Sequence, residues 1–271
     1  MSYYEALNLK KEPFSTSPDP DFLYRSSEHN SALKRLEIAI RLKRGLSLIL
    51  GDVGTGKTTL SRVLLQEFSS DNDFIFHVIL DPNYNSEFQF LEKLVDMFGI
   101  VPDNRTTHAY KEELEKYLFQ KGVEENKTIV LLIDEGQKLS SNFLEILRML
   151  LNYETNEYKL LQLVIMSQME LLPKIKKIKN FYDRIILKYI INPLDEKETH
   201  QMINFRLREA GLPPEKELFT PGATRLIYQY SQGYPRKISI LSHNALEELI
   251  IQEKDIVDES IISNVIRREA I

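Results

Sequence analysis

The sequence predicts an α/β fold in which a parallel, doubly wound sheet is followed by a small all-helical domain. Two observations carry this prediction. Between residues 31 and 191, short apolar runs alternate with segments of helical periodicity, as in parallel sheets that carry helices on both faces. After Asn192-Pro193 the short apolar runs stop and only helical periodicity remains.

Residues 1–30 are rich in proline, serine and aromatic residues and are expected to be irregular. Pro13-Phe14 and the segment 17–21 are not expected to be helical, because proline fixes its own φ and lacks a backbone donor. A helix is expected over 31–44, where leucine and isoleucine residues recur on one face.

The apolar runs that follow are short and lie between polar boundaries, so they are expected to be buried parallel strands. The expected strands are 46–50, 74–80, 128–133, 160–166 and 185–191. The expected helices between them are 57–68, 87–98, 110–121 and 142–153.

Glycine and proline punctuate the last part of the chain, at 211–214 and 233–235. The helices expected around them are 196–210, 221–230, 235–252 and 259–270. We therefore expect two domains, 1–192 with the sheet and 193–271 with these helices.

Composition narrows the class of protein. The 271 residues are 42% hydrophobic, which is enough for a folded core. The net charge of −5 excludes a surface that is strongly basic overall, but it does not exclude a local basic patch. Because there is no cysteine, disulfides, thiol catalysis and cysteine-ligated metals are excluded. No secretory signal pattern and no apolar run near ~20 residues occurs, so we expect a cytoplasmic protein.

A glycine-rich motif follows the first apolar run. It fits G-x-x-x-x-G-K-[ST] between an expected strand and an expected helix, and a chance glycine-rich turn is the alternative. Glycines let successive N–H groups curl around phosphate oxygens, which the N-terminus of the next helix also favours. Lys57 is expected to reach the β- and γ-phosphates of ATP, and the Thr58 hydroxyl to ligate Mg²⁺. The expected nucleotide-binding residues are Gly51, Val53, Gly54, Thr55, Gly56, Lys57, Thr58 and Thr59.

Two acidic residues end the expected strand 128–133. Asp134 is expected to hold the Mg²⁺ shell, and Glu135 to act as the general base that polarises the attacking water. A solvated acidic pair at a strand end is the alternative. Beside a phosphate loop, the pair favours hydrolysis over phosphoryl transfer to a metabolite.

Four further segments of the chain resemble one family. They are residues 3–9 (YYEALNL), 18–24 (PDPDFLY), 161–171 (LQLVIMSQMEL) and 233–238 (GYPRKI). Together with the phosphate loop and the acidic strand end, they resemble the AAA+ ATPases, and among these the secretion ATPase A (ExeA/GspA-like) group and its pilus-biogenesis relatives. Transposition ATPases of the Mu B and TnsC kind share much of this core. The resemblance implies the P-loop NTPase (AAA+) fold, with a helical lid, and an ATPase activity.

The resemblance also implies roles for two polar residues. Gln168, which follows an apolar strand, matches the residue called sensor 1, which contacts the attacking water or the γ-phosphate. Arg236 matches sensor 2, an arginine of the helical lid that reaches the phosphates, a role that suits a permanently charged, paired donor. Surface positions are the alternative for both.

Four more residues are implied less directly. Arg184 resembles the arginine finger that a neighbouring subunit inserts at the γ-phosphate, and Arg148 is the second candidate for this role. Such a finger requires the protein to form a homo-oligomer, as a ring or filament. An arginine paired with a nearby acid is the alternative for Arg184. Tyr24 and His29 lie in the N-terminal extension 1–30, which by resemblance borders the adenine, although a lone histidine is as often a packing residue.

The sequence is compatible with more than one kind of binding partner. A lysine tract at 174–179 can contact nucleic acid phosphates or be the solvated face of an amphipathic helix, because Ile175 and Ile178 are spaced i,i+3. Three hypotheses follow: an ATP-driven protein that remodels a partner in secretion or pilus biogenesis, an ATP-dependent DNA-binding regulator of transposition, and a nucleotide-gated adaptor with weak hydrolysis.

Overall fold

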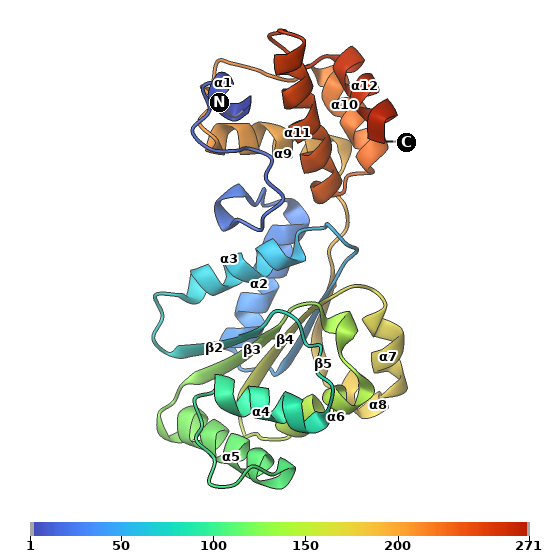
Figure 1. The fold of residues 1–271 in the computed structure, drawn as a ribbon. Helices are drawn as coiled ribbons and strands as arrows, with labels where there is room; N and C mark the ends of the chain where they lie inside the picture. The colour runs from blue at the N-terminus through green and yellow to red at the C-terminus, as the bar shows by residue number, and fades with distance from the viewer. Residues whose placement is uncertain (1–2, 270–271) are drawn as a thin grey trace. The chain divides into compact units, whose positions relative to one another are not determined.

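The computed structural model describes residues 3–269, and its contacts divide them into two units (Figure 1). The sheet unit comprises 30–52 and 61–191, and the helical unit comprises 3–29, 53–60 and 192–269. The domain limits of 1–192 and 193–271 stay a prediction. The last residue of the helix predicted over 259–270 lies outside the described residues.

The sheet unit contains a five-stranded parallel sheet in the order β2-β3-β4-β1-β5. The strands are β1 (Leu46–Leu50), β2 (Phe74–Ile79), β3 (Thr128–Ile133), β4 (Leu161–Ser167) and β5 (Ile185–Ile190). The predicted α/β fold with a parallel sheet is thus confirmed, and each strand lies within two residues of its predicted limits.

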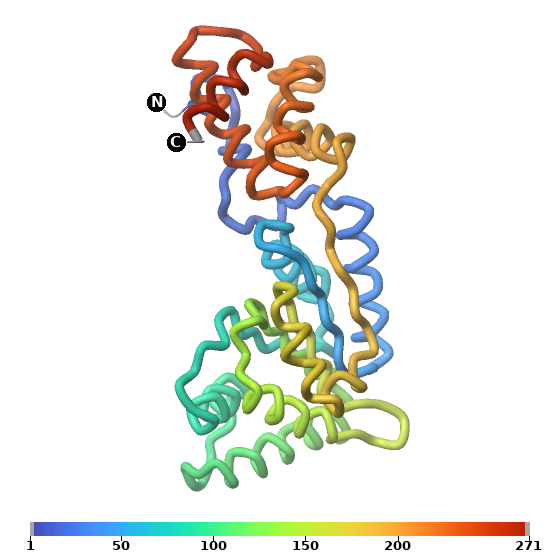
Figure 2. Tube along the Cα trace, turned by 90° about the vertical axis from the view of Figure 1, so that its right-hand side faces the viewer, coloured from blue at the N-terminus to red at the C-terminus, as the bar shows by residue number. Residues whose placement is uncertain are grey.

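Helices cover both faces of the sheet. Figures 1 and 2 show α4 (Glu87–Met97), α5 (Thr107–Phe119) and α6 (Ser141–Leu150) on one face and α2 (Ser27–Arg41) on the other. All residues of β1, β3 and β4 are buried, as expected for strands covered on both sides. Alternate strand residues join one core with the helices of the first face; among them are Leu48, Leu131, Leu163, Phe90, Leu94 and Leu147.

The helices differ from the predicted ones by up to four residues at their ends, and two short helices are additional. Helix α2 begins at Ser27 instead of 31, and a π turn (Gln120–Glu124) extends α5. Two short helices, α7 (Leu171–Lys177) and α8 (Lys179–Tyr182), were not predicted as elements. Segments of one or two turns give too few repeats for helical periodicity to be recognised.

The helical unit is built from α9 (Glu196–Glu209), α10 (Pro221–Ser231), α11 (Pro235–Ile251) and α12 (Glu259–Glu269). Residues expected to be irregular at the N-terminus contain α1 (Tyr3–Ala6) and a single 3-10 turn (Pro20–Phe22). The turn begins with proline at its first position, where the missing N–H costs nothing, and the Asp19 side chain caps it.

Apolar residues of the N-terminal segment belong to the core of the helical unit. Leu7, Leu9, Phe14 and Phe22 are buried in one cluster with residues of α9 to α12. Arg206 of α9 holds the same segment, since its guanidinium donates to the Ser15 carbonyl over 3.2 Å, and it also donates to Ser239 Oγ of α11. Burial lowers the pKa of this guanidinium to about 10.

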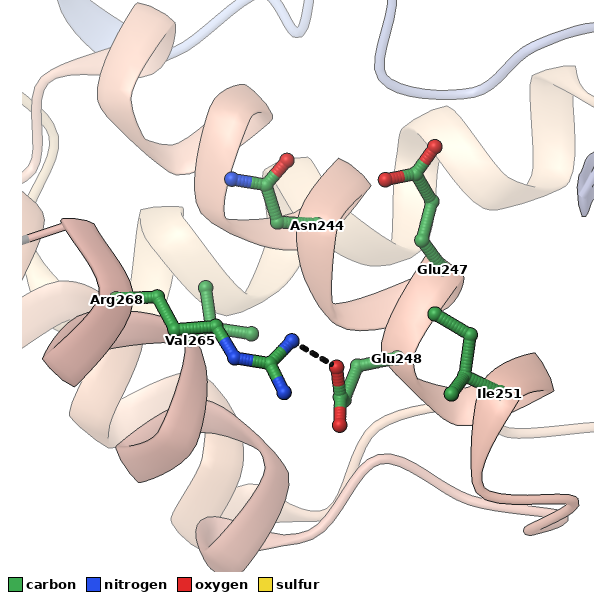
Figure 3. Close-up of a pocket in the computed structure, with 6 residues that line it drawn as sticks. All are labelled: Asn244, Glu247, Glu248, Ile251, Val265 and Arg268. Atoms are coloured by element: carbon green, nitrogen blue, oxygen red, sulfur yellow. Dashed lines mark hydrogen bonds and ion pairs between the residues drawn. The ribbon is translucent and has the colours of Figure 1, made fainter.

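A pocket of about 320 Å³ lies between α11 and α12 (Figure 3). It is lined by Asn244, Glu247, Glu248, Ile251, Val265 and Arg268. Arg268 Nη1 lies 2.5 Å from Glu248 Oε2. Hydrogen bonds from Gln252 and Arg268 lower the pKa of Glu248. None of the predicted site residues lines this pocket, and its ion pair ties α12 to α11.

Within residues 3–269, no helix combines the length and the apolar character that crossing a membrane requires.

The half-buried His77 of β2 makes the stability of the sheet unit depend on pH. Its ring stacks on Phe98 at 4.1 Å and its Nε2 lies 3.2 Å from the Tyr117 hydroxyl. Burial lowers its pKa from 6.5 to about 4. Between pH 4 and pH 6.5 the His77 side chain binds a proton more readily in the unfolded chain than in the folded one. The contribution of neutral His77 to the free energy of unfolding is therefore full above pH 6.5 and falls as the pH drops toward 4.

We expect His77→Phe, which packs on Phe98 and does not titrate, to lose less thermal stability than wild type between pH 7.5 and pH 5. The unfolding midpoint at both pH values measures this, and His108→Gln, at an exposed histidine, serves as the control. An equal loss in wild type and His77→Phe would contradict the assignment.

Candidate functional site

The phosphate loop follows β1 and leads into α3 (Lys57–Phe68). Gly54 and Gly56 adopt φ values of +82° and +95°, which favour glycine. A Cβ on Gly54 would lie 2.9 Å from Arg236 Cβ, and one on Gly56 would lie 3.0 Å from His29 Nε2. Helix α3 has no acid in its first turn. This backbone therefore fits a phosphate chain, since glycines shape the loop and the helix N-terminus favours an anion.

The other predicted loop residues differ in exposure. Thr55 and Lys57 are buried, Thr58 and Thr59 are half-buried, and Val53 is exposed.

His29 supports this loop directly. Its Nε2 lies 2.9 Å from the Thr55 carbonyl and its Nδ1 lies 2.7 Å from Ser26 Oγ. A carbonyl only accepts, so Nε2 carries the proton, and in the neutral ring Nδ1 accepts from the Ser26 hydroxyl. Burial lowers the pKa of His29, which keeps the ring neutral at pH 7. The structure places His29 against the loop backbone, and its predicted contact with adenine stays a prediction.

We expect His29→Ala to weaken ATP binding by about tenfold, because it removes the buried hydrogen bond from His29 to the Thr55 carbonyl, a loss of about 1–3 kcal/mol. Titration with a fluorescent ATP analogue measures the dissociation constant. His200→Ala, at a half-buried histidine on α9, is the matched control. Unchanged affinity in His29→Ala would show that the bond to Thr55 does not shape the loop for nucleotide.

Arg236 lies at the start of α11, against the same loop. Its backbone N–H donates to the Gly54 carbonyl over 3.2 Å, while its side chain is exposed. The preceding Gly233 has a φ of +75°, and a Cβ there would lie 1.9 Å from the Leu194 carbonyl oxygen. The helix then starts with Pro235 in its first turn. The Gly-Tyr-Pro-Arg sequence thus places the backbone of Arg236 beside the loop, and the sensor 2 role of its side chain stays a prediction.

Tyr24 is fastened to α9. Its hydroxyl donates to Gln201 Oε1 over 2.7 Å, and its ring lies 6.1 Å from that of Phe205. Burial is the main cause that raises the pKa of this hydroxyl. Its predicted contact with adenine also stays a prediction.

In the sheet unit, the ends of three strands carry the other predicted residues. Parallel strands β1, β4 and β3 end side by side, and the Gly51 N–H donates to the Ser167 carbonyl over 3.2 Å. Asp134 follows β3 and its N–H donates to the Ile79 carbonyl over 2.8 Å. Ligands of parallel α/β sheets bind at this carboxyl edge.

Asp134 is buried and Glu135 half-buried at this edge. Glu135 has φ 52° and ψ 35°, a left-handed conformation that is uncommon outside glycine and clusters at functional sites. Its N–H donates to Asp134 Oδ1 over 2.8 Å. A carboxylate such as that of Asp134 suits Mg²⁺, which takes one or two carboxylates and completes its shell with phosphate and water. Within residues 3–269, no group of three or more histidine, cysteine, aspartate or glutamate side chains is arranged to hold a metal ion.

The structure links Glu135 to Gln168 through a residue that the sequence did not single out. Gln137 Nε2 donates to Glu135 Oε2 over 2.7 Å, and Gln137 Oε1 accepts from the Gln168 N–H over 3.1 Å. Ser167 Oγ donates to the same oxygen over 3.3 Å. The only available signal was a polar residue two positions after the acidic pair.

The two candidate arginine fingers are both held within the chain. Arg184 is half-buried and donates to Asn152 Oδ1 and, over 3.3 Å, to the Asn180 carbonyl. Arg148 pairs with Glu145 at 2.6 Å. Whether either acts on a neighbouring subunit stays a prediction.

The lysine tract occupies α7 and the start of α8. Leu171 and Ile175 are fully buried, so the helix is amphipathic. Lys174, Lys176, Lys177 and Lys179 are exposed. Lys174 Nζ donates to the Gln137 carbonyl over 2.6 Å.

The structure brings some of the predicted residues together within each unit. In the helical unit, His29 and Arg236 each lie against the phosphate loop, at Thr55 and Gly54 respectively. In the sheet unit, Glu135 and Gln168 are joined through Gln137. Sequence reasoning missed Gln137, and also Ser26, which orients His29.

Comparison with known proteins places the chain in a family. The AAA domain family matches residues 40–175. General secretion pathway protein A of Aeromonas hydrophila is 34% identical over 246 residues, which are 90% of this chain and 44% of that protein. The chain therefore spans less than half the length of this relative, and the resemblance to the secretion ATPase A group is confirmed.

Solved structures show the same fold. The Aeropyrum pernix ORC2 protein, in its ADPNP-ADP complexes, superposes with a TM-score of 0.69 at 17% identity, over 96% of this chain and 71% of that one. The Thermotoga maritima RuvB Holliday junction branch migration motor gives a TM-score of 0.59 at 15% identity, over 88% and 68%. Phosphate loop, acidic strand end, sheet order and family match agree, and the chain belongs to the AAA domain family.

Proposed function

We propose that the protein binds ATP with Mg²⁺ and hydrolyses it to ADP and phosphate. The observation that carries this proposal is the phosphate loop, whose Gly54 and Gly56 take positive φ values that let successive N–H groups turn toward one anion. Membership of the AAA domain family supports it.

In this proposal each site residue has a separate role in ATP binding or hydrolysis. The loop N–H groups and Lys57 hold the phosphates, and Thr58 and Asp134 hold Mg²⁺, which supplies charge neutralisation at the phosphates. Glu135 accepts the proton of the attacking water, so that the water oxygen forms its bond to the γ-phosphorus while the bond to the ADP oxygen breaks. Gln168 orients the water or the γ-phosphate, Arg236 donates to the phosphates, and Arg184 of a neighbouring subunit stabilises the transition state.

We further propose that ATP drives assembly of the chain into a ring or filament that remodels a protein partner in secretion or pilus biogenesis, in the cytoplasm. The 34% identity with a general secretion pathway protein over 90% of this chain supports this role. Coupling requires that the assembled form bind ATP more tightly than the separate subunits do.

DNA is the second candidate partner. The exposed lysines at 176, 177 and 179 could each neutralise a DNA phosphate, which gives a salt-dependent affinity that ignores base sequence. This surface favours the alternative function, an ATP-dependent regulator of transposition.

One experiment separates these candidates. The ATPase rate is measured with and without duplex DNA, beside light scattering that follows the mass of the protein in ATP and in ADP. Mass that grows in ATP without a DNA effect supports the secretion or pilus role. Stimulation by DNA that disappears at high salt and in Lys176→Ala/Lys177→Ala/Lys179→Ala supports the DNA role. No ATP turnover under any condition rejects the proposed activity.

A further inference from the structure

Gln137 lies in the one-turn 3-10 helix (Gly136–Lys138) that directly follows the acidic pair. Its side-chain amide bridges two strand ends of the sheet unit, the Glu135 carboxylate after β3 and the Gln168 backbone after β4. These two residues are the general base and the sensor of the proposed reaction.

The orientation of the Gln137 amide follows from its partners. A carboxylate only accepts hydrogen bonds and a backbone N–H only donates, so the amide nitrogen must face Glu135 and the amide oxygen must face Gln168. The reversed orientation would place two acceptors against each other at one end and two donors at the other. The bridge therefore has one arrangement, which fixes one carboxylate oxygen of Glu135 relative to the end of β4.

The turn that carries Gln137 is itself held on three sides. Lys174 of α7 donates to the Gln137 carbonyl over 2.6 Å, and Lys138 pairs with Asp81 at 3.0 Å. A Cβ on Gly136 would lie 2.4 Å from Ile165 Cγ2, so the turn packs tightly on β4. A side chain carried by such a fixed turn can hold its neighbour in one place.

We infer that Gln137 is a positioning residue, which holds the Glu135 carboxylate in register with Gln168 so that base and sensor address the same water. This inference rests on the proposed ATP hydrolysis. A misplacement of about 1 Å at a reacting group can cost on the order of 10²-fold in rate, so the bond between Gln137 and Glu135 is expected to affect turnover and leave nucleotide binding intact.

Two variants of Gln137 test the inference. Gln137→Met keeps the length of the side chain but makes neither hydrogen bond. Gln137→Glu keeps the shape and the acceptor for Gln168 but cannot donate to Glu135 when ionised. Matched controls are Gln120→Met and Gln120→Glu, because Gln120 also donates to a glutamate, Glu125, over 3.3 Å at an exposed turn.

We expect kcat for ATP to fall about tenfold to a hundredfold in both Gln137 variants, with KM within about twofold of wild type and unfolding midpoints close to those of the controls. In a Glu135→Gln background, Gln137→Met should have almost no further effect, since residues that act as a unit are not additive. A residue that only supports folding would instead change stability or KM and would lower the residual rate by the same factor in both backgrounds.

The outcomes are distinct. If the unmodified protein hydrolyses ATP and either folded Gln137 variant has the same kcat, the positioning role is overturned and the proposed function stands. The same conclusion follows if Gln137→Met lowers the rate by an equal factor with and without the Glu135 carboxylate. Absence of turnover in the wild type rejects the proposed function, and the inference with it.

Discussion

Glu135→Gln is expected to bind ATP with wild-type affinity and to lose ATP turnover by about 10²-fold or more. The substitution keeps the shape of the side chain and its bond from Gln137, but an amide cannot take the proton of the attacking water. Because the loop that holds the phosphates is untouched, the loss should appear in kcat. Phosphate release at saturating ATP, measured beside nucleotide titration, gives both quantities.

The control for this variant is Glu125→Gln. Like Glu135, Glu125 accepts a hydrogen bond from a glutamine, Gln120, and it also accepts one from Lys121. It lies directly after the π turn that extends α5. We expect its turnover to match wild type. If Glu135→Gln hydrolyses ATP at the wild-type rate, the assignment of the base is wrong.

Arg184→Ala is expected to lower turnover by about 10³-fold, the contribution of an arginine finger in other phosphate-loop proteins. In the chain described here the guanidinium rests on Asn152 and Asn180, and no acid pairs with it among the ion pairs of residues 3–269. To act in trans it must leave these two neutral partners, which costs less than leaving a carboxylate. Arg148, which is paired with Glu145, would have to break an ion pair.

Mixed assemblies test the action in trans. Arg184→Ala subunits keep an intact nucleotide site, and Lys57→Ala subunits keep the finger, so a mixture should regain part of the activity that each lacks alone. Arg148→Ala mixed with Lys57→Ala is the comparison. Failure to regain activity in an assembly that contains both subunits, or recovery only in the Arg148 mixture, would assign the finger elsewhere.

The parts of this protein that sequence reasoning predicted are those coded by contiguous residues. The phosphate loop needs eight adjacent residues, and each strand needs one short apolar run, so both are visible in the sequence. The order of the strands is not, because it depends on which strands pair after the chain has crossed over a helix.

Residues whose role depends on distant contacts were predicted less well. The contact of His29 with Thr55 could not be predicted, because it depends on how 3–29 packs against the loop; the expected contact with adenine stays a prediction. Gln137 escaped notice because its function lies in a bridge between two strand ends, which no spacing in the sequence encodes. Leu7 lies in the segment that was expected to be irregular, but it is part of the core with α9 to α12.

The most direct test of ATP hydrolysis is Mg²⁺-dependent phosphate release by the wild-type chain at saturating ATP, with Lys57→Ala and Glu135→Gln measured in parallel. The account predicts steady release by the wild type that stops when Mg²⁺ is chelated. It predicts loss of ATP binding in Lys57→Ala, and binding without turnover in Glu135→Gln. Wild-type release no greater than that of Glu135→Gln would contradict the account.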